Sequence, residues 1–424
     1  MTQADPSPSY RALFAVPAIG RILLGIVIAR TAATMSSVVL VLFTLTYFKS
    51  PELAGAVTFV SIVPGLIVAP LAGALLDRHG RSLLVIVDYL TAAGACLAIA
   101  LLAYSGTLSA PLLLLIAACN GITWPLSTSG LRSLVPLIVP RPLWERANAI
   151  DSNGYVIATL IGPPAAGALV SISGGPLALA VVGAVFAIAA MVMIGIPDPR
   201  VPFESTGGLL EDTVAGVRYV FRNRTLRALA VSLSLMNIGG GILQILVPVL
   251  LLDRLHQGPA VVGLAWAVSG VAGLVAALIV GRIDTRGREK WLIVWPLLGT
   301  AAVLATLLAP AQLWLIVAVL AVVGFLNGPM DVGMFTIRQR RTDPAWMGRA
   351  FAISMALNFA GFPVGSALGG LLVDHSVELA VLIGAGSALL AAVCAVWLIP
   401  RHAEDEGPEA AGRDAAHAEA APAD

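Results

Sequence analysis

Long apolar runs alternate with short polar connections along almost the whole chain. An α-helix needs about 20 mostly apolar residues to cross the hydrocarbon core of a bilayer, and twelve runs are long enough. The pattern therefore predicts twelve membrane-spanning helices. Their residue ranges are 22–48, 53–76, 83–104, 110–136, 149–172, 177–197, 227–252, 259–282, 291–309, 312–337, 350–373 and 378–399.

Composition supports an all-α membrane protein and disfavours an enzyme. Hydrophobic residues make up 58% of the chain and charged residues only 12%, whereas about a quarter of a soluble protein is charged. No zinc-protease, nucleophile-elbow or phosphate-loop motif occurs, so we expect neither catalysis nor direct use of ATP. The three cysteines lie in apolar runs without metal-ligand spacing. We therefore expect no metal, no cofactor and no nucleic-acid partner.

Basic residues predict the orientation of the chain in the plasma (inner) membrane. The connections alternate between two sets, and among the 25 Lys and Arg only Lys49 and Arg254 lie in the first set. Excess Lys and Arg mark the cytoplasmic side of a membrane. The second set of connections and both termini are therefore predicted to be cytoplasmic, as an even number of spans requires.

An internal repeat predicts two similar halves. The residues Asp77, Gly80 and Arg81 recur 207 positions later as Asp284, Gly287 and Arg288. The chain is therefore divided into a six-helix bundle at 1–197, a linker at 198–226, a second six-helix bundle at 227–400 and a disordered tail at 401–424. Apolar residues at helical spacing in the linker favour an amphipathic helix on the cytoplasmic surface, with an ordinary linker helix as the alternative.

The repeated loop connects the second and third spans, and later the eighth and ninth. Gly73 allows a neighbouring helix to approach closely, and Gly80 allows a tight turn. Asp77 ends the second span, where its charge can face the positive N-terminal end of another helix. Arg78 and Arg81 hold the loop on the cytoplasmic side.

This loop resembles the signature loop of the major facilitator superfamily, in which the aspartate contacts the end of the eleventh span. The resemblance covers residues 15–400 and implies a secondary transporter with alternating access and a proton gradient as its energy source. It also implies that Asp77 contacts the region of residues 346–349. The second copy, with Asp284, Gly287 and Arg288, is expected to latch the same side.

Two further stretches resemble exporters of this superfamily. Gly162, Pro163 and Gly167 in the fifth span resemble the antiporter motif, although Ala166 replaces one of its glycines. Pro163 removes a backbone hydrogen bond, so a kinked and closely packed helix is expected. Residues 131–150 resemble the branch that includes macrolide and enterobactin exporters. The fourth span lacks the central arginine of many proton-linked members.

Ionisable residues inside predicted spans are candidates for function because burying them in a membrane is costly. Arg30 can bind an anionic group or pair with a carboxylate. Asp88 and Asp331 are candidate proton carriers, and Asp88 can alternatively pair with a nearby arginine. Asp151 is expected to stabilise the start of the fifth helix without further function.

Polar and aromatic residues within the spans predict a central substrate cavity. The candidates are Arg30, Asn153, Tyr155, Asn237, Gln244, Asn327, Met330, Asn358 and Phe359. The leading hypothesis is a monomeric exporter of a small amphipathic compound, drug-like or siderophore-like, driven by proton antiport. The alternative is an uptake porter or facilitator for a small metabolite.

Overall fold

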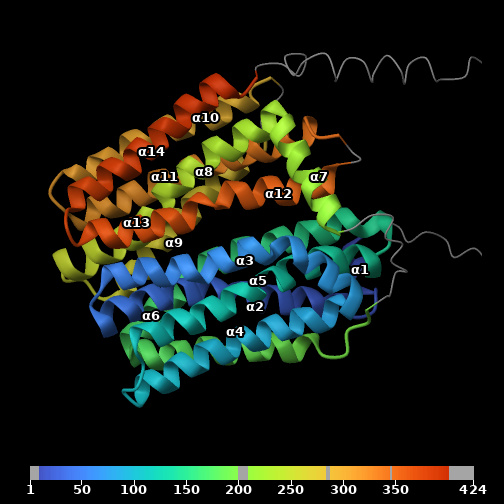
Figure 1. Cartoon of the computed structure of the whole chain (residues 1–424), viewed down its shortest axis with the longest axis horizontal. Coiled ribbons are helices and arrows are strands. Elements are labelled where there is room, and N and C mark those ends of the chain that lie inside the picture. Colours follow the sequence, from blue (N-terminus) through green and yellow to red (C-terminus); the bar gives the residue numbers. More distant parts are fainter. Residues whose placement is uncertain (1–8, 199–208, 283–286, 344–345, 401–424) are drawn as a thin grey trace, which may run out of the picture.

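The chain is helical throughout the residues that the structure describes. The computed structural model describes residues 9–198, 209–282, 287–343 and 346–400. The helices are α1 (Tyr10–Phe14), α2 (Ile19–Phe43), α3 (Pro51–His79), α4 (Arg81–Tyr104), α5 (Ala110–Ile138), α6 (Trp144–Met193), α7 (Leu209–Arg222), α8 (Arg224–Val249), α9 (Pro259–Val280), α10 (Glu289–Ala305), α11 (Leu313–Arg340), α12 (Met347–Phe359), α13 (Gly361–Val373) and α14 (Val377–Leu398). Figure 1 shows them as two bundles lying side by side.

Eleven helices in the described residues are long and apolar enough to cross a membrane. One of them contains α6, whose 50 residues would extend about 75 Å as a single helix, far more than the hydrocarbon thickness. Gly174 interrupts α6 with non-helical backbone angles (φ 76°, ψ 166°), within the connection expected between the fifth and sixth spans. Counted as two spans, α6 completes the predicted set of twelve.

The two halves share unusual backbone conformations 207 residues apart. Lys49 (φ 53°) and His256 (φ 51°) both adopt the left-handed conformation, which is uncommon for residues other than glycine. Short π-helical turns precede them, at Thr44–Phe48 and Leu250–Arg254. The repeat detected in the sequence is therefore also present in the local geometry of the chain.

One bundle contains α2–α6 and the other contains α8–α14 (Figure 1). They meet mainly through two helix pairs, α3 with α13 and α6 with α9, and α8 makes smaller contacts with α2 and α3. The backbones approach so closely that a Cβ atom on Gly55 would overlap the carbonyl oxygen of Ser366. A Cβ on Gly167 would lie 2.5 Å from the carbonyl oxygen of Pro259. Only glycine fits at these crossings.

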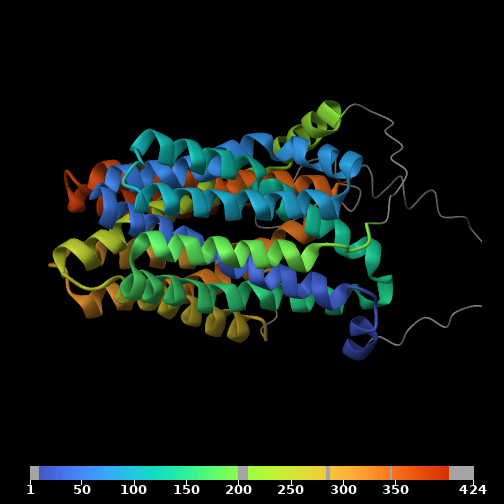
Figure 2. The ribbon, with the colours of Figure 1, turned by 90° about the horizontal axis from the view of Figure 1, so that it is seen from below.

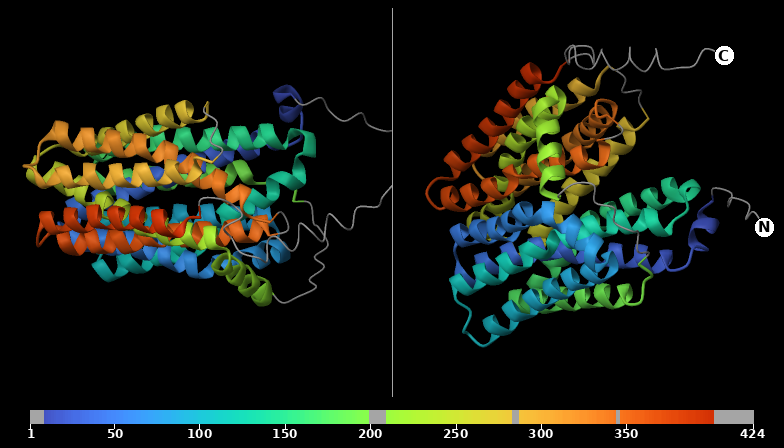
Figure 3. Two further views of the ribbon diagram at one scale, coloured as in Figure 1. Left: turned by 90° about the horizontal axis from the view of Figure 1, so that it is seen from above. Right: turned by 45° about the vertical axis from the view of Figure 1, so that its right-hand side comes forward.

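These glycine crossings lie at the end of the molecule opposite α7. Toward the other end, called here the α7 end, the two bundles diverge (Figure 3). Basic side chains at the α7 end stabilise the ends of helices. Arg21 Nη2 donates to the carbonyl oxygen of Val192 (3.0 Å), and Lys290 Nζ donates to those of Val396 and Ile399 (2.7 Å each). Cations at helix C-termini offset the unpaired carbonyl groups there.

Candidate functional site

An ion pair links the first and fifth spans inside the N-terminal bundle. Arg30 Nη1 lies 2.9 Å from Asp151 Oδ1, and it also donates to the backbone oxygen of Asp151 at 2.7 Å. The guanidinium stands over the ring of Tyr155, 3.7 Å from the ring centre. The Arg30 and Asp151 side chains are 16% and 30% exposed. Solvent or a substrate can therefore reach the guanidinium and the carboxylate.

The structure corrects the expectation that Asp151 stabilises the start of the fifth helix. α6 begins at Trp144, so Asp151 lies two turns inside the helix rather than at its start. Its carboxylate is held by a cation from another helix. The predicted helix began at residue 149 because the polar stretch before that position resembled a loop.

The Asp88 carboxylate is buried between α4 and α5, with Ser127 and Thr123 within hydrogen-bonding reach. The predicted alternative was a pair with Arg81 or Arg132. Arg81 instead donates from Nε to Ser133 Oγ at 3.2 Å. Asp88 therefore joins two helices through hydroxyl groups.

A cavity of about 200 Å³ lies inside the C-terminal bundle. None of the described residues that line it is charged. The lining residues are Met236, Asn237, Gly239, Gly240, Leu243, Gln244, Trp266, Ser269, Thr300, Leu304, Val323, Asn327 and Phe362. Asn327 Oδ1 is buried without a hydrogen-bond partner among the described residues. A buried amide oxygen without a donor favours a ligand that brings one.

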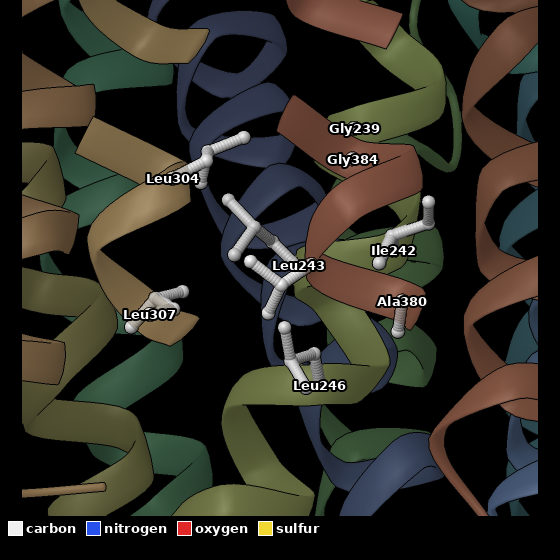
Figure 4. A pocket seen from close by; sticks show the side chains of 9 residues that line it. Gly239, Ile242, Leu243, Leu246, Leu304, Leu307, Ala380 and Gly384 are labelled. Carbon is white, nitrogen blue, oxygen red and sulfur yellow. The ribbon is translucent and has the colours of Figure 1, made fainter. Parts of the chain in front are cut away.

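A smaller apolar gap of about 10 Å³ adjoins this cavity (Figure 4). Leu243 and Leu304 line both spaces, and Leu246, Leu307 and Ala380 extend the apolar surface away from the amides. The cavity is therefore polar on one side and continues into an aliphatic region on the other.

The predicted cavity residues separate into four groups. Asn237, Gln244 and Asn327 line the C-terminal cavity, and Arg30 and Tyr155 form the N-terminal cluster. Asn153 and Phe359 are exposed, whereas Met330 and Asn358 are buried between helices. The sequence pattern detected unusual polar positions but not which of them share one space.

Asp331 lies on α11, one helical turn from Asn327 toward the α7 end. Its side chain is exposed, and it has no ion-pair or hydrogen-bond partner among the described residues. Residues four apart share one side of a helix. Asp331 therefore lies on the same side of α11 as Asn327, one turn beyond the cavity lining.

Sequence reasoning missed Arg338, whose side chain is fully buried near the end of α11. Its Nη1 lies 2.7 Å from Met355 Sδ, and its guanidinium lies over the Phe351 ring at 5.1 Å. With the Asn358 amide oxygen facing it, Nη2 donates to that oxygen at 2.5 Å. No carboxylate pairs with Arg338 among the described residues. Arg338 was missed because it belongs to the basic stretch "RQRR", and such stretches are typical of exposed cytoplasmic loops.

The first copy of the repeated loop turns at Gly80, whose φ of 98° favours glycine. Asp198, which follows α6, accepts a hydrogen bond from the Ser82 backbone at 3.0 Å and so satisfies the start of α4. Arg78 is exposed. The surroundings of Gly73 and the side chain of Asp77 lie outside the described set, so the predicted close approach at Gly73 and the predicted contact of Asp77 stay predictions.

The second copy of the loop is described only in part. Gly287 has a positive φ of 72°, as Gly80 also does at 98°. Arg288 follows it and immediately precedes α10. Asp284 lies outside the described residues, so its predicted latch role stays a prediction.

Replacing Gly80 with Ala is expected to destabilise the protein by about 1–2 kcal/mol, because a Cβ at positive φ is strained. The new Cβ would also lie 2.7 Å from Asp198 Oδ2. Thermal unfolding in detergent tests this, with Gly94→Ala as the control, because a Cβ there meets nothing within 4 Å. Equal melting temperatures for the two variants would contradict the assignment.

The fifth-span motif makes close contacts on two sides of α6. A Cβ on Gly162 would overlap Thr34 Oγ1, and one on Gly167 would meet α9. Pro163 supplies the carbonyl oxygen that a Cβ on Gly263 of α9 would overlap. In the described backbone of α6 the angles are non-helical only at Gly174, so Pro163 causes no break. Pro163 and Gly167 therefore lie where the two halves cross, whereas Gly162 packs against α2 within the N-terminal half.

Comparison with known proteins identifies the class of this chain. It matches the Major Facilitator Superfamily over residues 22–283 and 229–422. The chain belongs to this superfamily, whose members are transmembrane transporters and not enzymes, and it is a multi-pass membrane protein acting on a small-molecule substrate. The predicted family and fold are confirmed.

Particular relatives refine the comparison. "Uncharacterized MFS-type transporter y4rN" of Sinorhizobium fredii is 37% identical over 92% of this chain and 97% of its own. Multidrug efflux pump Tap of Mycolicibacterium fortuitum is 26% identical over 89% and 96%. Macrolide efflux protein A of Streptococcus pyogenes is 22% identical over 75% and 80%. The crystal structure of the nucleoside transporter NupG has the same fold, with a TM-score of 0.72 and 12% identity, and the match covers 90% of this chain and 99% of that one.

Proposed function

We propose that this chain is a secondary active exporter that removes a small amphipathic compound from the cytoplasm in exchange for protons. The α7 end is the cytoplasmic side of the plasma membrane, because nearly all Lys and Arg outside the spans belong to that end. Similarity to a multidrug efflux pump over 89% of the chain supports export.

The observation that carries this proposal is the two-sided character of the C-terminal cavity. Amide and hydroxyl groups with Trp266 form one side, and leucines continue beyond them. Such a surface suits a ligand with hydrogen-bonding groups at one end and an apolar body at the other. Across the molecule, the Arg30–Asp151 pair and Tyr155 provide a charged and aromatic surface in the other half.

Alternating access supplies the mechanism. The halves are packed tightly at the glycine crossings and diverge at the α7 end, as in a state open to the cytoplasm. Rocking of one half against the other would open the opposite side. Asp77 and Asp284, with the arginines of their loops, would latch the cytoplasmic side when it closes. A ligand shifts this balance only by its different affinity for the two states.

Asp331 is the proposed proton carrier. It is exposed beside the cavity wall without a partner among the described residues, whereas Asp88 is buried against Ser127 and Thr123. A carboxylate that a proton and a substrate can both reach is suited to antiport, because protonation removes the charge that the substrate meets.

Inverted membrane vesicles with an imposed pH gradient test the proposal, using amphipathic dyes and antibiotics as probes. We expect accumulation that an uncoupler abolishes. We also expect Asp331→Asn to lose gradient-driven accumulation by about tenfold or more, because an intramembrane carboxylate that couples to protons cannot be replaced by an amide.

Asp253→Asn is the matched control, because Asp253 is an exposed carboxylate at the opposite end of the molecule. Accumulation that ignores the gradient would contradict proton antiport and favour a facilitator. Transport found only in right-side-out vesicles would favour uptake. Loss in Asp88→Asn with full activity in Asp331→Asn would transfer the carrier role to Asp88.

A further inference from the structure

The linker helix α7 has two different faces. One face packs on the C-terminal bundle, where Val220 is fully buried against Leu226 and Ala350. Tyr219 stacks on Trp346 with ring centres 5.0 Å apart and planes 9° apart. α7 therefore packs against the start of α12.

The opposite face of α7 is exposed and combines apolar and basic side chains. Val214, Val217 and Phe221 are 50%, 37% and 49% exposed. Arg218 and Arg222 are exposed beside them. The spacing of these residues, at i, i+3, i+4, i+7 and i+8, places all five on one side of the helix. Three of the apolar residues whose spacing predicted an amphipathic helix therefore point away from the protein.

The position of α7 suits a membrane surface. The helix lies across the end of the bundles (Figure 1), and it projects beyond their side in the perpendicular view (Figure 2). In the proposed orientation this is the cytoplasmic end of the spans, where lipid headgroups would meet acyl chains. A helix lying in this boundary buries its apolar side chains and extends arginines toward phosphates.

We propose that the face formed by Val214, Val217, Arg218, Phe221 and Arg222 binds anionic phospholipids of the cytoplasmic leaflet. The cytoplasmic leaflet is negatively charged and attracts basic residues near its surface. The two arginines provide the matching charge, and the three apolar side chains provide the insertion. The inference depends on the proposed orientation, but not on the substrate or on the direction of transport.

Lipid bound at this face would act on the transporter through α12. The Tyr219 hydroxyl accepts a hydrogen bond from the Asp343 backbone at 3.0 Å. Asn223 Nδ2 donates to the backbone oxygen of Arg341 at 2.9 Å, and Asn223 Oδ1 accepts from the start of α8. α7 therefore holds the connection between α11 and α12. Anionic lipid would restrain this connection and with it the cytoplasmic opening.

Quenching of a fluorophore by brominated lipid tests the proposal in the full chain. The label is attached at Val217→Cys after Cys119 and Cys394 are replaced by Ala, since Cys96 is buried. The protein is reconstituted in phosphatidylcholine with phosphatidylglycerol, and either lipid is supplied in brominated form. We expect stronger quenching by brominated phosphatidylglycerol, and weaker preference at high salt.

Removing the arginines identifies the cause of the preference. Arg218→Gln with Arg222→Gln is expected to reduce the preference for phosphatidylglycerol, by about fivefold per arginine. The control is Arg132→Gln with Arg141→Gln, which removes the same charge from exposed positions outside α7. We expect this control to leave the preference for phosphatidylglycerol unchanged. A label at Leu101→Cys, which is 69% exposed on α4, should be quenched equally by both lipids.

Two outcomes would overturn the inference. Equal quenching of the α7 label by both lipids, unchanged by the Gln variants, would mean that the arginines do not select anionic lipid. Absence of quenching by either lipid, with normal quenching at position 101, would mean that protein or water covers this face. Neither outcome would alter the test of export, because that test measures dye accumulation.

Discussion

Replacing Arg30 with Gln is expected to reduce transport by about tenfold or more and to lower thermal stability. The change leaves the Asp151 carboxylate partly buried without its cation and removes the guanidinium from the Tyr155 ring. Breaking a fully buried ion pair costs about 3–5 kcal/mol. The Arg30–Asp151 pair is partly exposed and is screened by solvent, so we expect a loss of stability of about 1–3 kcal/mol. Dye accumulation in inverted vesicles and melting in detergent measure the two effects.

A double-mutant cycle separates the pair from the individual residues. Asp151→Asn alone should destabilise similarly, while Arg30→Gln with Asp151→Asn should recover part of the lost stability, because neither charge is then left alone. Arg30→Lys keeps the charge but loses the second hydrogen bond, from Nη2 to Asp151 Oδ2 at 3.1 Å, and the stacking on Tyr155, so intermediate transport is expected. Additive losses in the double variant would show that Arg30 and Asp151 act independently.

The spans were predictable because the bilayer requires long apolar helices, and length and composition record that requirement directly. Eleven of the helices and the break at Gly174 follow the predicted pattern. The start of α6 did not, because residues 144–148 are polar and read as a loop, although they are helical. That difference of about one turn and a half reversed the interpretation of Asp151, from a helix-end residue to the partner of Arg30.

The substrate region was only partly predictable for a geometric reason. A polar residue in an apolar span is visible in the sequence, so Asn237, Gln244 and Asn327 could be found. The direction in which each side chain points depends on helix rotation and packing. Asn358 was as conspicuous as Asn327, yet it is buried between α11 and α12. Its partner Arg338 was hidden because charge near the end of a run is the normal pattern of a membrane helix.

Replacing Arg338 with Met is expected to preserve or raise thermal stability while reducing transport about tenfold or more. The guanidinium is fully buried against Met355, Phe351 and Asn358 with no carboxylate beside it among the described residues. Substituting buried charges by apolar side chains of similar size is often neutral or stabilising by about 1–4 kcal/mol.

Because the charge of Arg338 does not stabilise the state described here, we expect it to act in another state. In a cytoplasm-closed state we expect an anionic group to lie beside it. Arg132→Met, at an exposed position on α5, should change stability by no more than about 0.5 kcal/mol and leave transport intact. Melting in detergent and dye accumulation in inverted vesicles are measured for both variants. A large fall in melting temperature for Arg338→Met would show instead that the buried arginine holds α11 and α12 together, because losing its contacts to Met355 and Asn358 would then outweigh the removal of its charge.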